Sequence, residues 1–260
     1  MSYEGPQFYD QAAVFQSYMQ HRQRPDNPND TLEQPIILAL LGSVSGVDIL
    51  DLGCGDAALG KTLLAQGAAS YLGLDGSRNM VERAQQTLVG TAGKVTEADI
   101  RSWTYPPDTF DCVLSRLVLH YIEDVDHVFQ QVFQTLRPAG VFVFSVEHPV
   151  ITSCDRAWQD GSMRQAWIVD DYFDSGRRVT HWLGEQVVKY HRAVEEYFLG
   201  LQTAGFVVER LRESRPERRW FVHEETYQRR TRIPLFLFLV ARKPLSSAEQ
   251  QARRGPHLAP

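Results

Sequence analysis

The chain has 260 residues, of which 43% are hydrophobic, and it carries a formal net charge of −5. This length accommodates one large domain, or one domain with a sizeable insertion, and the hydrophobic content suffices for a core. The negative charge argues against nonspecific binding of nucleic acid. No apolar run reaches the roughly 18–20 residues of a membrane span. These properties favour a globular protein that acts on something other than nucleic acid.

The number of cysteines and the N-terminal residues give an expectation for the cellular compartment of the protein. Three scattered cysteines (Cys54, Cys112 and Cys154) give neither a disulfide framework nor the paired spacing of a zinc site. The N-terminus lacks the basic and apolar regions of a signal peptide. We therefore expect a cytoplasmic protein with reduced cysteines and no metal site.

The N-terminal segment precedes the regular part of the chain. Residues 7–24 hold several aromatic side chains, and a stretch rich in Pro, Asn and Asp follows. Asp30 and Glu33 have the spacing of a capping box, which predicts a helix over the apolar run Ile36–Leu41.

Residues 47–60 carry the strongest signal. An apolar strand over 47–52 ends at Gly53, a second glycine follows at Gly55, and a helix is predicted over 57–68. Glycines let the backbone approach a ligand closely, and a helix N-terminus offers free N–H groups, so this turn is typical of a nucleotide-like ligand site. The glycines and Asp75 also fit a dinucleotide fingerprint, which leaves a nicotinamide-dependent oxidoreductase as an alternative.

Asp51 separates the two alternatives. It lies near the end of the buried strand, two residues before Gly53. A buried carboxylate needs hydrogen-bond donors or a cationic partner. It repels a pyrophosphate, whereas it attracts a ligand that carries an amino group and a sulfonium.

Short apolar strands alternate with amphipathic helices from residue 47 to residue 146. This rhythm predicts an α/β fold with a doubly wound parallel sheet. The expected strands are 47–52, 70–74, 94–97, 110–115 and 141–147, and later Phe206–Leu211 and Leu235–Ala241. The expected helices are 57–68, 77–88, 124–136 and Glu195–Ala204, with a brief turn near Leu119–Ile122.

An aromatic-rich insertion interrupts this rhythm at residues 149–191. Asp174-Ser175-Gly176 separates two β-rich runs, which predicts a hairpin at that point. Its aromatic residues, which include Trp158 and Trp167, need cover, so the insertion is either a substrate lid or an oligomer contact. The sequence leaves a monomer and a homodimer open.

Five segments in order resemble the class I S-adenosylmethionine (SAM)-dependent methyltransferases, and the closest resemblance is to the small-molecule branch that includes quinone-biosynthesis enzymes. The segments are Asp51–Gly55, Tyr71–Ser77, Glu97–Ile100, Phe110–Ser115 and Leu136–Val146. The resemblance implies a Rossmann-like sheet of seven strands in the order 3-2-1-4-5-7-6, with the last strand antiparallel. It also implies one domain over residues 1–244, with an N-terminal cap over about 1–30 and an inserted lid. We expect residues 245–260 to form a disordered tail.

The resemblance implies SAM as cofactor and assigns roles to the matching positions. Asp75 would accept hydrogen bonds from the ribose hydroxyls, Asp99 would contact the adenine amino group, and Arg22 would pair with the methionine carboxylate. Asp75 acting only as a helix cap and Met80 acting only as core packing are the plainer alternatives. The full set of implied cofactor residues is Asp51, Gly53, Cys54, Gly55, Asp75, Gly76, Met80, Asp99, Ile100, Ser115, Tyr18 and Arg22.

Methyl transfer is an in-line displacement in which positioning supplies much of the rate. A general base, where one is used, belongs near the ends of strands four and five or on the lid. The candidates are His148, His191 and His120, because a neutral imidazole has a suitable pKa near 7. Each can instead bond the local backbone. The expected substrate contacts are Tyr190, Trp182 and Tyr121.

The sequence therefore predicts a methyltransferase that acts on O, N or C of a small organic acceptor. A SAM-binding regulatory protein without turnover remains a further alternative. Eight arginines within residues 209–232 leave an anionic acceptor possible, although a solvated, ion-paired surface is the plainer interpretation.

Overall fold

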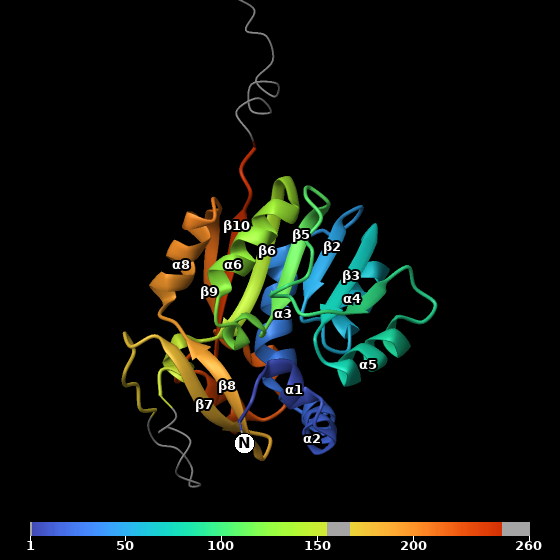
Figure 1. Cartoon of the computed structure of the whole chain (residues 1–260). Helices are drawn as coiled ribbons and strands as arrows, with labels where there is room; N and C mark the ends of the chain where they lie inside the picture. The colour runs from blue at the N-terminus through green and yellow to red at the C-terminus, as the bar shows by residue number, and fades with distance from the viewer. Residues whose placement is uncertain (1, 155–166, 246–260) are drawn as a thin grey trace, which may run out of the picture.

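The computed structural model describes residues 2–154 and 167–245. Within these residues, seven strands form one sheet in the order β4-β3-β2-β5-β6-β10-β9 (Figure 1). Their bounds are β2 Asp48–Leu52, β3 Ser70–Asp75, β4 Lys94–Glu97, β5 Phe110–Arg116, β6 Leu136–Glu147, β9 Val207–Glu213 and β10 Phe236–Arg242. The strand β10 is antiparallel to both of its neighbours. The predicted Rossmann-like strand order and the antiparallel last strand are confirmed.

Helices cover both faces of this sheet because side chains alternate along each strand. Cys112 and Leu114 of β5 pack on the face covered by α3, α4 and α5, whereas Val113 packs on the face covered by α6 and α8. The bounds are α3 Gln34–Leu41, α4 Ala58–Ala65, α5 Arg78–Leu88, α6 Val125–Thr135 and α8 Val194–Thr203. The carboxyl ends of the parallel strands remain open to other segments.

The junction between α6 and β6 differs from its predicted position. The helix ends at Thr135, and β6 begins at Leu136 rather than at residue 141, because Leu136 already pairs with Phe110 of β5. The register between β5 and β6 shifts directly afterwards, and Ala139 adopts a positive φ of 65°. The Pro-Ala-Gly residues therefore form an irregularity within a strand, not a loop before it.

A second sheet joins the N-terminus to the insertion. The strand β1 (Ser2–Tyr3) pairs in parallel with β8 (Glu185–His191), which pairs antiparallel with β7 (Gly176–Trp182). The hairpin turn lies at Leu183-Gly184, where both residues have positive φ values of 51° and 90°. The predicted turn at residues 174–176 is wrong, because that segment only leads into β7.

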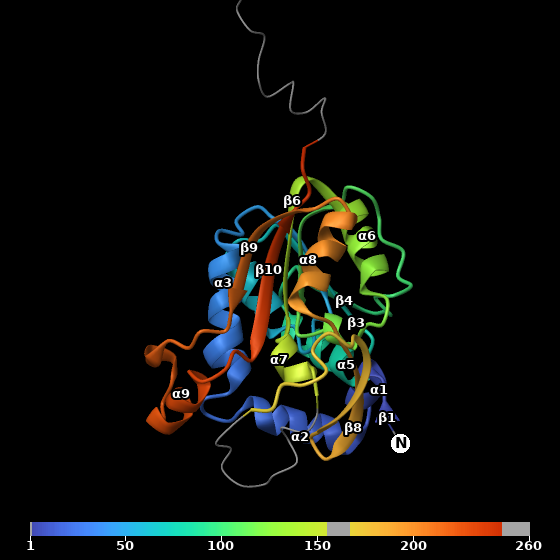
Figure 2. The same ribbon diagram turned by 90° about the vertical axis from the view of Figure 1, so that its left-hand side faces the viewer.

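The remaining segments lie around the carboxyl ends of the parallel strands. Helices α1 and α2 lie beside the β7–β8 hairpin below the main sheet in Figures 1 and 2. The bounds are α1 Gly5–Tyr9, α2 Ala12–Arg22, a π-helical turn η1 Asn29–Glu33, a 3₁₀ turn η2 Leu119–Tyr121, α7 Pro149–Thr152, a 3₁₀ turn η4 Arg218–Trp220 and α9 Glu224–Arg230. These segments place side chains from distant parts of the chain at one end of the sheet.

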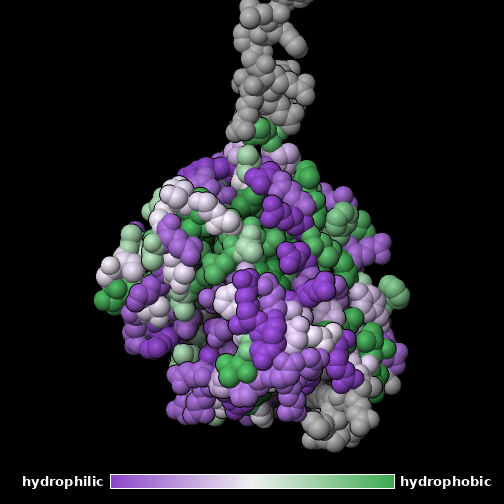
Figure 3. All heavy atoms as spheres, turned by 180° about the vertical axis from the view of Figure 1, so that it is seen from behind, coloured by the Kyte–Doolittle hydropathy of each residue, from purple (hydrophilic) through white to green (hydrophobic). Residues whose placement is uncertain are grey.

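The outer surface mixes polar and apolar groups. The face opposite to Figure 1 is mainly hydrophilic in its lower half, with hydrophobic side chains interspersed above (Figure 3). No helix in the described ranges is both long and apolar enough to cross a membrane. Trp158 and residues 246–260 of the expected tail lie outside the described residues.

Candidate active site

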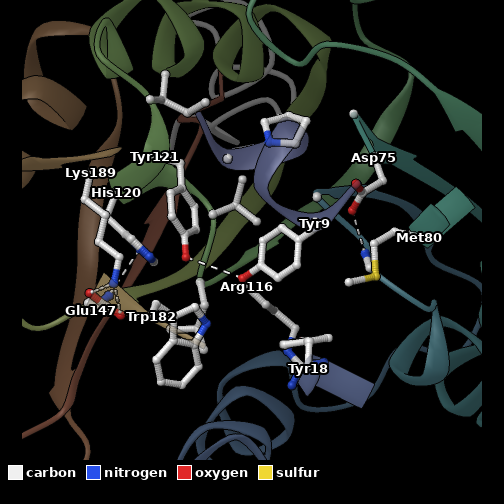
Figure 4. Close-up of a pocket in the computed structure, with 18 of the residues that line it drawn as sticks. Tyr9, Tyr18, Asp75, Met80, Arg116, His120, Tyr121, Glu147, Trp182 and Lys189 are labelled. Carbon is white, nitrogen blue, oxygen red and sulfur yellow. Dashed lines mark hydrogen bonds and ion pairs between the residues drawn. The ribbon is translucent and has the colours of Figure 1, made fainter. Parts of the chain in front are cut away.

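One cavity of about 390 Å³ lies at the carboxyl ends of the parallel strands, and its walls divide into two sides (Figure 4). The Asp75 side consists of Gly53, Gly55, Asp75, Gly76, Met80, Asp99 and Ile100. The Glu147 side consists of His120, Tyr121, Glu147, Thr180, Trp182, Lys189 and Arg230. Tyr9 lies between Asp75 and Glu147 in Figure 4, so the N-terminal segment contacts the cavity where the two sides meet.

The turn after β2 presents its backbone to the Asp75 side. Gly53 has a φ of 72°, and a side chain there would meet the Val118 side chain at 2.2 Å. Gly55 also has a positive φ, of 57°, but a Cβ added there would have no atom within 4 Å. Only glycine therefore fits at position 53, whereas Gly55 leaves open space beside its backbone.

Asp75 ends β3 and is fixed by this turn. Its Oδ2 accepts a hydrogen bond from the Gly55 N–H at 2.8 Å, and its Oδ1 accepts one from the Ser77 N–H at 2.9 Å. Burial raises the pKa of the Asp75 carboxyl to about 6, although both N–H groups favour the charged form. Each oxygen keeps a further lone pair for a ligand donor.

Three residues expected at the cofactor lie behind the wall instead of lining the cavity. The Asp51 carboxylate accepts a hydrogen bond from the Tyr71 hydroxyl at 2.7 Å, and its Oδ1 is buried without a partner among the described residues. Burial raises the pKa of the Asp51 carboxyl to about 6. The Cys54 Sγ lies against Gly73. The fully buried Ser115 donates its hydroxyl to the Leu52 carbonyl at 3.1 Å.

Asp99, Ile100 and Met80 complete the Asp75 side. Asp99 is paired with Arg101, whose Nη2 lies 2.8 Å from its Oδ2. Hydrogen bonds from Arg101 lower the pKa of the Asp99 carboxyl. Arg101 also pairs with Glu4 at 3.1 Å, which links this edge to the N-terminal segment.

The N-terminal segment adds aromatic and basic groups. Tyr18 and Arg22 both line the cavity from α2. The Arg22 guanidinium lies 3.0 Å from Asp30, and burial raises the pKa of the Tyr18 hydroxyl to about 12. Asp10 accepts a hydrogen bond from the Ser77 hydroxyl at 2.7 Å, so the segment is attached to the start of α5.

A buried ion pair dominates the Glu147 side. The Lys189 Nζ lies 2.7 and 2.8 Å from the two carboxylate oxygens of Glu147, and Lys189 is only 5% exposed. Burial alone would raise the pKa of Glu147, but the charge of Lys189 outweighs it and holds this pKa below its ordinary value. The pair therefore stays ionised at neutral pH.

His120 lines the cavity beside this pair. Its Nδ1 accepts a hydrogen bond from the Glu147 backbone N–H at 3.4 Å, and burial lowers the pKa of its imidazole to about 4. The neutral ring then carries its proton on Nε2 and acts as a donor there.

The three expected substrate contacts lie in different places. Tyr121 and Trp182 line the cavity, and the Tyr121 hydroxyl lies 3.4 Å from the Tyr9 hydroxyl. Tyr190 does not line it, because side chains alternate along β8 and its neighbour Lys189 takes the inward position. Lys189 was not predicted as a site residue, although its alternation with the apolar Val187 was a usable signal.

His148 and His191, both proposed as candidate bases, do not line the cavity. The His148 Nδ1 caps α7 by accepting from the Val150 N–H at 3.2 Å, and its Nε2 lies 3.0 Å from Glu213. The fully buried His191 bonds Thr152 at 2.8 Å and the Tyr172 carbonyl at 3.0 Å. Burial lowers the pKa of both rings. Because Pro149 is the first residue of α7, His148 occupies the N-cap position and its ring bonds the first turn of the helix.

Arg116 and Arg230 are two further cavity residues that the sequence analysis did not single out. The Arg116 Nε lies 3.0 Å from both carboxylate oxygens of Glu33, a fully buried residue of η1 that also accepts from the Ser145 hydroxyl. A charged residue directly after a buried strand was the available signal for Arg116, as it was for Asp75. Arg230 lies among seven other arginines of residues 209–232, and nothing in the sequence distinguishes it from them.

Comparison with solved structures defines the class of protein. The chain superposes on a SAM-dependent methyltransferase from Mesorhizobium loti with a TM-score of 0.74 and 36% identity, over 81% of this chain and 97% of that one. A structure from Listeria monocytogenes, described as a putative SAM-dependent methyltransferase, gives 0.74 and 33% over 81% and 96%. The fold is that of a class I SAM-dependent methyltransferase.

Sequence comparison agrees with this class. Residues 50–144 match the family model "Methyltransferase domain". An uncharacterised protein from Haemophilus influenzae is 30% identical over 90% of this chain and 96% of its own length. The chain belongs to the SAM-dependent methyltransferase family, and its cofactor is SAM. The glycines and Asp75 alone fit both SAM and a nicotinamide cofactor, and family membership identifies SAM. The assignment to the quinone-biosynthesis branch stays a prediction.

The Asp75 side fits this cofactor. The free space beside Gly55, the remaining lone pairs of Asp75 and the apolar surfaces of Met80 and Ile100 suit a methionine chain, a ribose and a purine ring. The unpartnered Oδ1 of Asp51 adds negative charge beneath the glycine turn, which suits a cationic ligand above it.

Proposed function

We propose that this protein transfers the methyl group of SAM to a small organic acceptor bound on the Glu147 side of the cavity. One observation carries the proposal: the Asp75 side and the Glu147 side are walls of one continuous cavity. An acceptor on the Glu147 side would therefore lie next to a cofactor held on the Asp75 side. Such proximity is the main requirement for an in-line displacement.

The segments that cover the cavity favour a small acceptor over a macromolecule. The N-terminal segment contributes Tyr9 and Tyr18, and the hairpin contributes Trp182, whose ring lies 5.4 Å from that of His21. These aromatic surfaces suit a partly apolar or ring-bearing molecule. A protein or nucleic-acid substrate would require a more open approach to the strand ends.

The chain positions the acceptor and keeps it from solvent. When bound, SAM supplies a methyl group on a positively charged sulfur. His120 is held neutral with its Nε2 as a donor, and Lys189 keeps Glu147 ionised and weakly basic. Neither of these groups is suited to remove a proton near pH 7. We therefore propose that the acceptor atom, whether O, N or C, arrives with its electron pair already available.

Ligand binding and labelled-methyl transfer test the proposal. SAM and its demethylated product, S-adenosylhomocysteine, should raise the melting temperature by mass action, whereas NAD should not. Label from methyl-labelled SAM should then appear in a compound of a small-molecule extract. Binding of both ligands without transfer to any fraction would instead favour a SAM-binding regulatory protein. Cytoplasmic location and the choice between monomer and homodimer stay predictions.

A further inference from the structure

Arg230 differs from the other cations of the cavity. Arg22, Arg101, Arg116 and Lys189 each lie within 3.1 Å of a carboxylate oxygen. For Arg230, by contrast, the described part of the chain offers no acidic partner, and its Nε is buried without any hydrogen-bond acceptor. The Glu147 side thus holds one positive charge that the protein itself does not neutralise.

The start of α9, the helix that carries Arg230, is anchored to the rest of the protein. Asp26 of the N-terminal segment accepts hydrogen bonds from the Val222 and His223 N–H groups at 2.6 and 2.9 Å. Phe221 is only 5% exposed and packs into the core, with the Tyr227 ring 5.6 Å away. The guanidinium is therefore carried by an anchored segment, which lowers the entropy cost of binding a ligand.

The cost of this arrangement indicates a ligand. A guanidinium that is partly buried, with one N–H buried and unpaired, lowers the stability of a folded protein, and such a group persists where binding or catalysis uses it. Burial and the neighbouring Arg229 lower the pKa of Arg230 to about 10, so it remains charged at neutral pH. The hydroxyl of Thr180, which lines the same cavity, is also buried without a partner among the described residues. A guanidinium and a hydroxyl donor together suit an oxyanion.

The location of Arg230 favours the acceptor over the cofactor as the source of this oxyanion. Burial and nearby arginines, among them Arg230, lower the pKa of His21, and the His21 ring lies 5.4 Å from that of Trp182 on the Glu147 side. Phe236, which also lines the cavity, opens β10 opposite Glu147. The strand β10 lies three positions from β2 in the sheet, which is about 14 Å at the usual strand spacing. The glycine turn that faces the cofactor follows β2.

We propose that Arg230, assisted by Thr180, is the anion-binding residue of the acceptor site, and that the methyl acceptor carries a carboxylate or phosphate group. This inference rests on the proposed methyl transfer. It concerns recognition of the acceptor only, and the anionic group either anchors the molecule or is itself methylated.

The decisive comparison uses two adjacent arginines. Arg230→Met removes the cavity cation, and Arg229→Met removes an exposed charge from the same helix as a control. The probes are benzoate and phenyl phosphate, with neutral benzamide as the matched control, added to protein saturated with S-adenosylhomocysteine. Melting temperature and calorimetry measure their binding.

We expect benzoate or phenyl phosphate to bind to the wild type and to Arg229→Met, and to bind about 10- to 100-fold more weakly to Arg230→Met. Whichever oxyanion binds identifies a carboxylate or a phosphate source. Binding of S-adenosylhomocysteine should be unchanged, and the ligand-free melting temperature of Arg230→Met should be equal to or above that of the wild type. Failure of both oxyanions to bind, or equal binding to Arg230→Met, would overturn the inference.

Labelled-methyl transfer separates this inference from the proposed function. A metabolite extract is first divided by ion exchange into anionic, neutral and cationic fractions, and each is offered with labelled SAM. Transfer into the anionic fraction, reduced in Arg230→Met, supports both proposals. Transfer only into the neutral or cationic fraction overturns the oxyanion and keeps the methyltransferase. Transfer into no fraction counts against the methyltransferase itself.

Discussion

The Asp75 side and the Glu147 side of the cavity are built in different ways. The Asp75 side comes from a short stretch of chain, residues 53–100, and consists mostly of backbone, two carboxylates and apolar side chains. The Glu147 side gathers residues from five separate elements, η2, β6, β7, β8 and α9, and contains the largely buried Lys189–Glu147 ion pair. A local wall can hold a constant ligand, whereas a wall assembled from distant segments can vary with the substrate.

The largest expected effect is on the Glu147 side. Lys189→Met leaves the partly buried Glu147 carboxylate without its cation, which should destabilise the protein by about 3 kcal/mol, the lower end for a buried pair. Urea unfolding measures the change. The double variant Lys189→Met/Glu147→Gln should recover most of it, since neither position of the pair then carries a charge. A loss of SAM affinity comparable to the loss of stability would contradict the separation of the two sides.

The next effect concerns the Asp75 side. Asp75→Asn should weaken SAM binding by about 10- to 100-fold, because a charged acceptor for the ribose hydroxyls is lost. Isothermal titration calorimetry measures the affinity. Asp56→Asn in the same turn is the matched control, since Asp56 does not line the cavity and should change the affinity less than twofold. Equal effects of the two variants would remove Asp75 from the cofactor site.

Acidification should separate cofactor binding from stability. Burial raises the pKa of Asp75 from its ordinary value of 3.8 to about 6, so its contribution to stability is fully present below pH 3.8 and is lost as pH rises through 6. SAM needs the carboxylate, so its affinity should fall by up to about tenfold per pH unit below 6. Titration calorimetry between pH 5 and 8 measures this. A profile that persists unchanged in Asp75→Asn would exclude Asp75 as its cause.

The smallest effect is expected outside the cavity. His148→Asn keeps a side chain that can cap α7, so it should cost at most about 1 kcal/mol and change turnover less than twofold. His191→Ala should lower stability through the lost bonds to Thr152 and Tyr172 while SAM affinity stays the same. A large fall in turnover of the folded His148→Asn protein would restore this residue as a catalytic base.

The sequence predicted the architecture because local patterns determine it. The alternation of strands with helices and the glycine turn after Asp51 are short-range features, and the strand order followed from the family resemblance. The sequence also identified Asp75, Met80 and Ile100, all of which line the cavity.

The Glu147 side was harder to predict because its residues meet only in three dimensions. Lys189 and Tyr190 are neighbours in sequence, and only the register of β8 determines which one faces inward. His148 has the composition and position of a base, but the helix that starts at Pro149 uses its ring as a cap. Arg230 is one of eight similar arginines, and its isolation from carboxylates depends on the packing of α9.

The parallel pairing of β1 with β8 has a consequence for synthesis of the chain. Ser2 pairs with Gln186, so the first strand made must wait for a hairpin that leaves the ribosome much later. Contacts that join such distant residues form slowly. We expect residues 48–147 to form their part of the main sheet first. The small sheet of β1, β7 and β8 should form last. A newly made chain should therefore bind cofactor before it can enclose an acceptor.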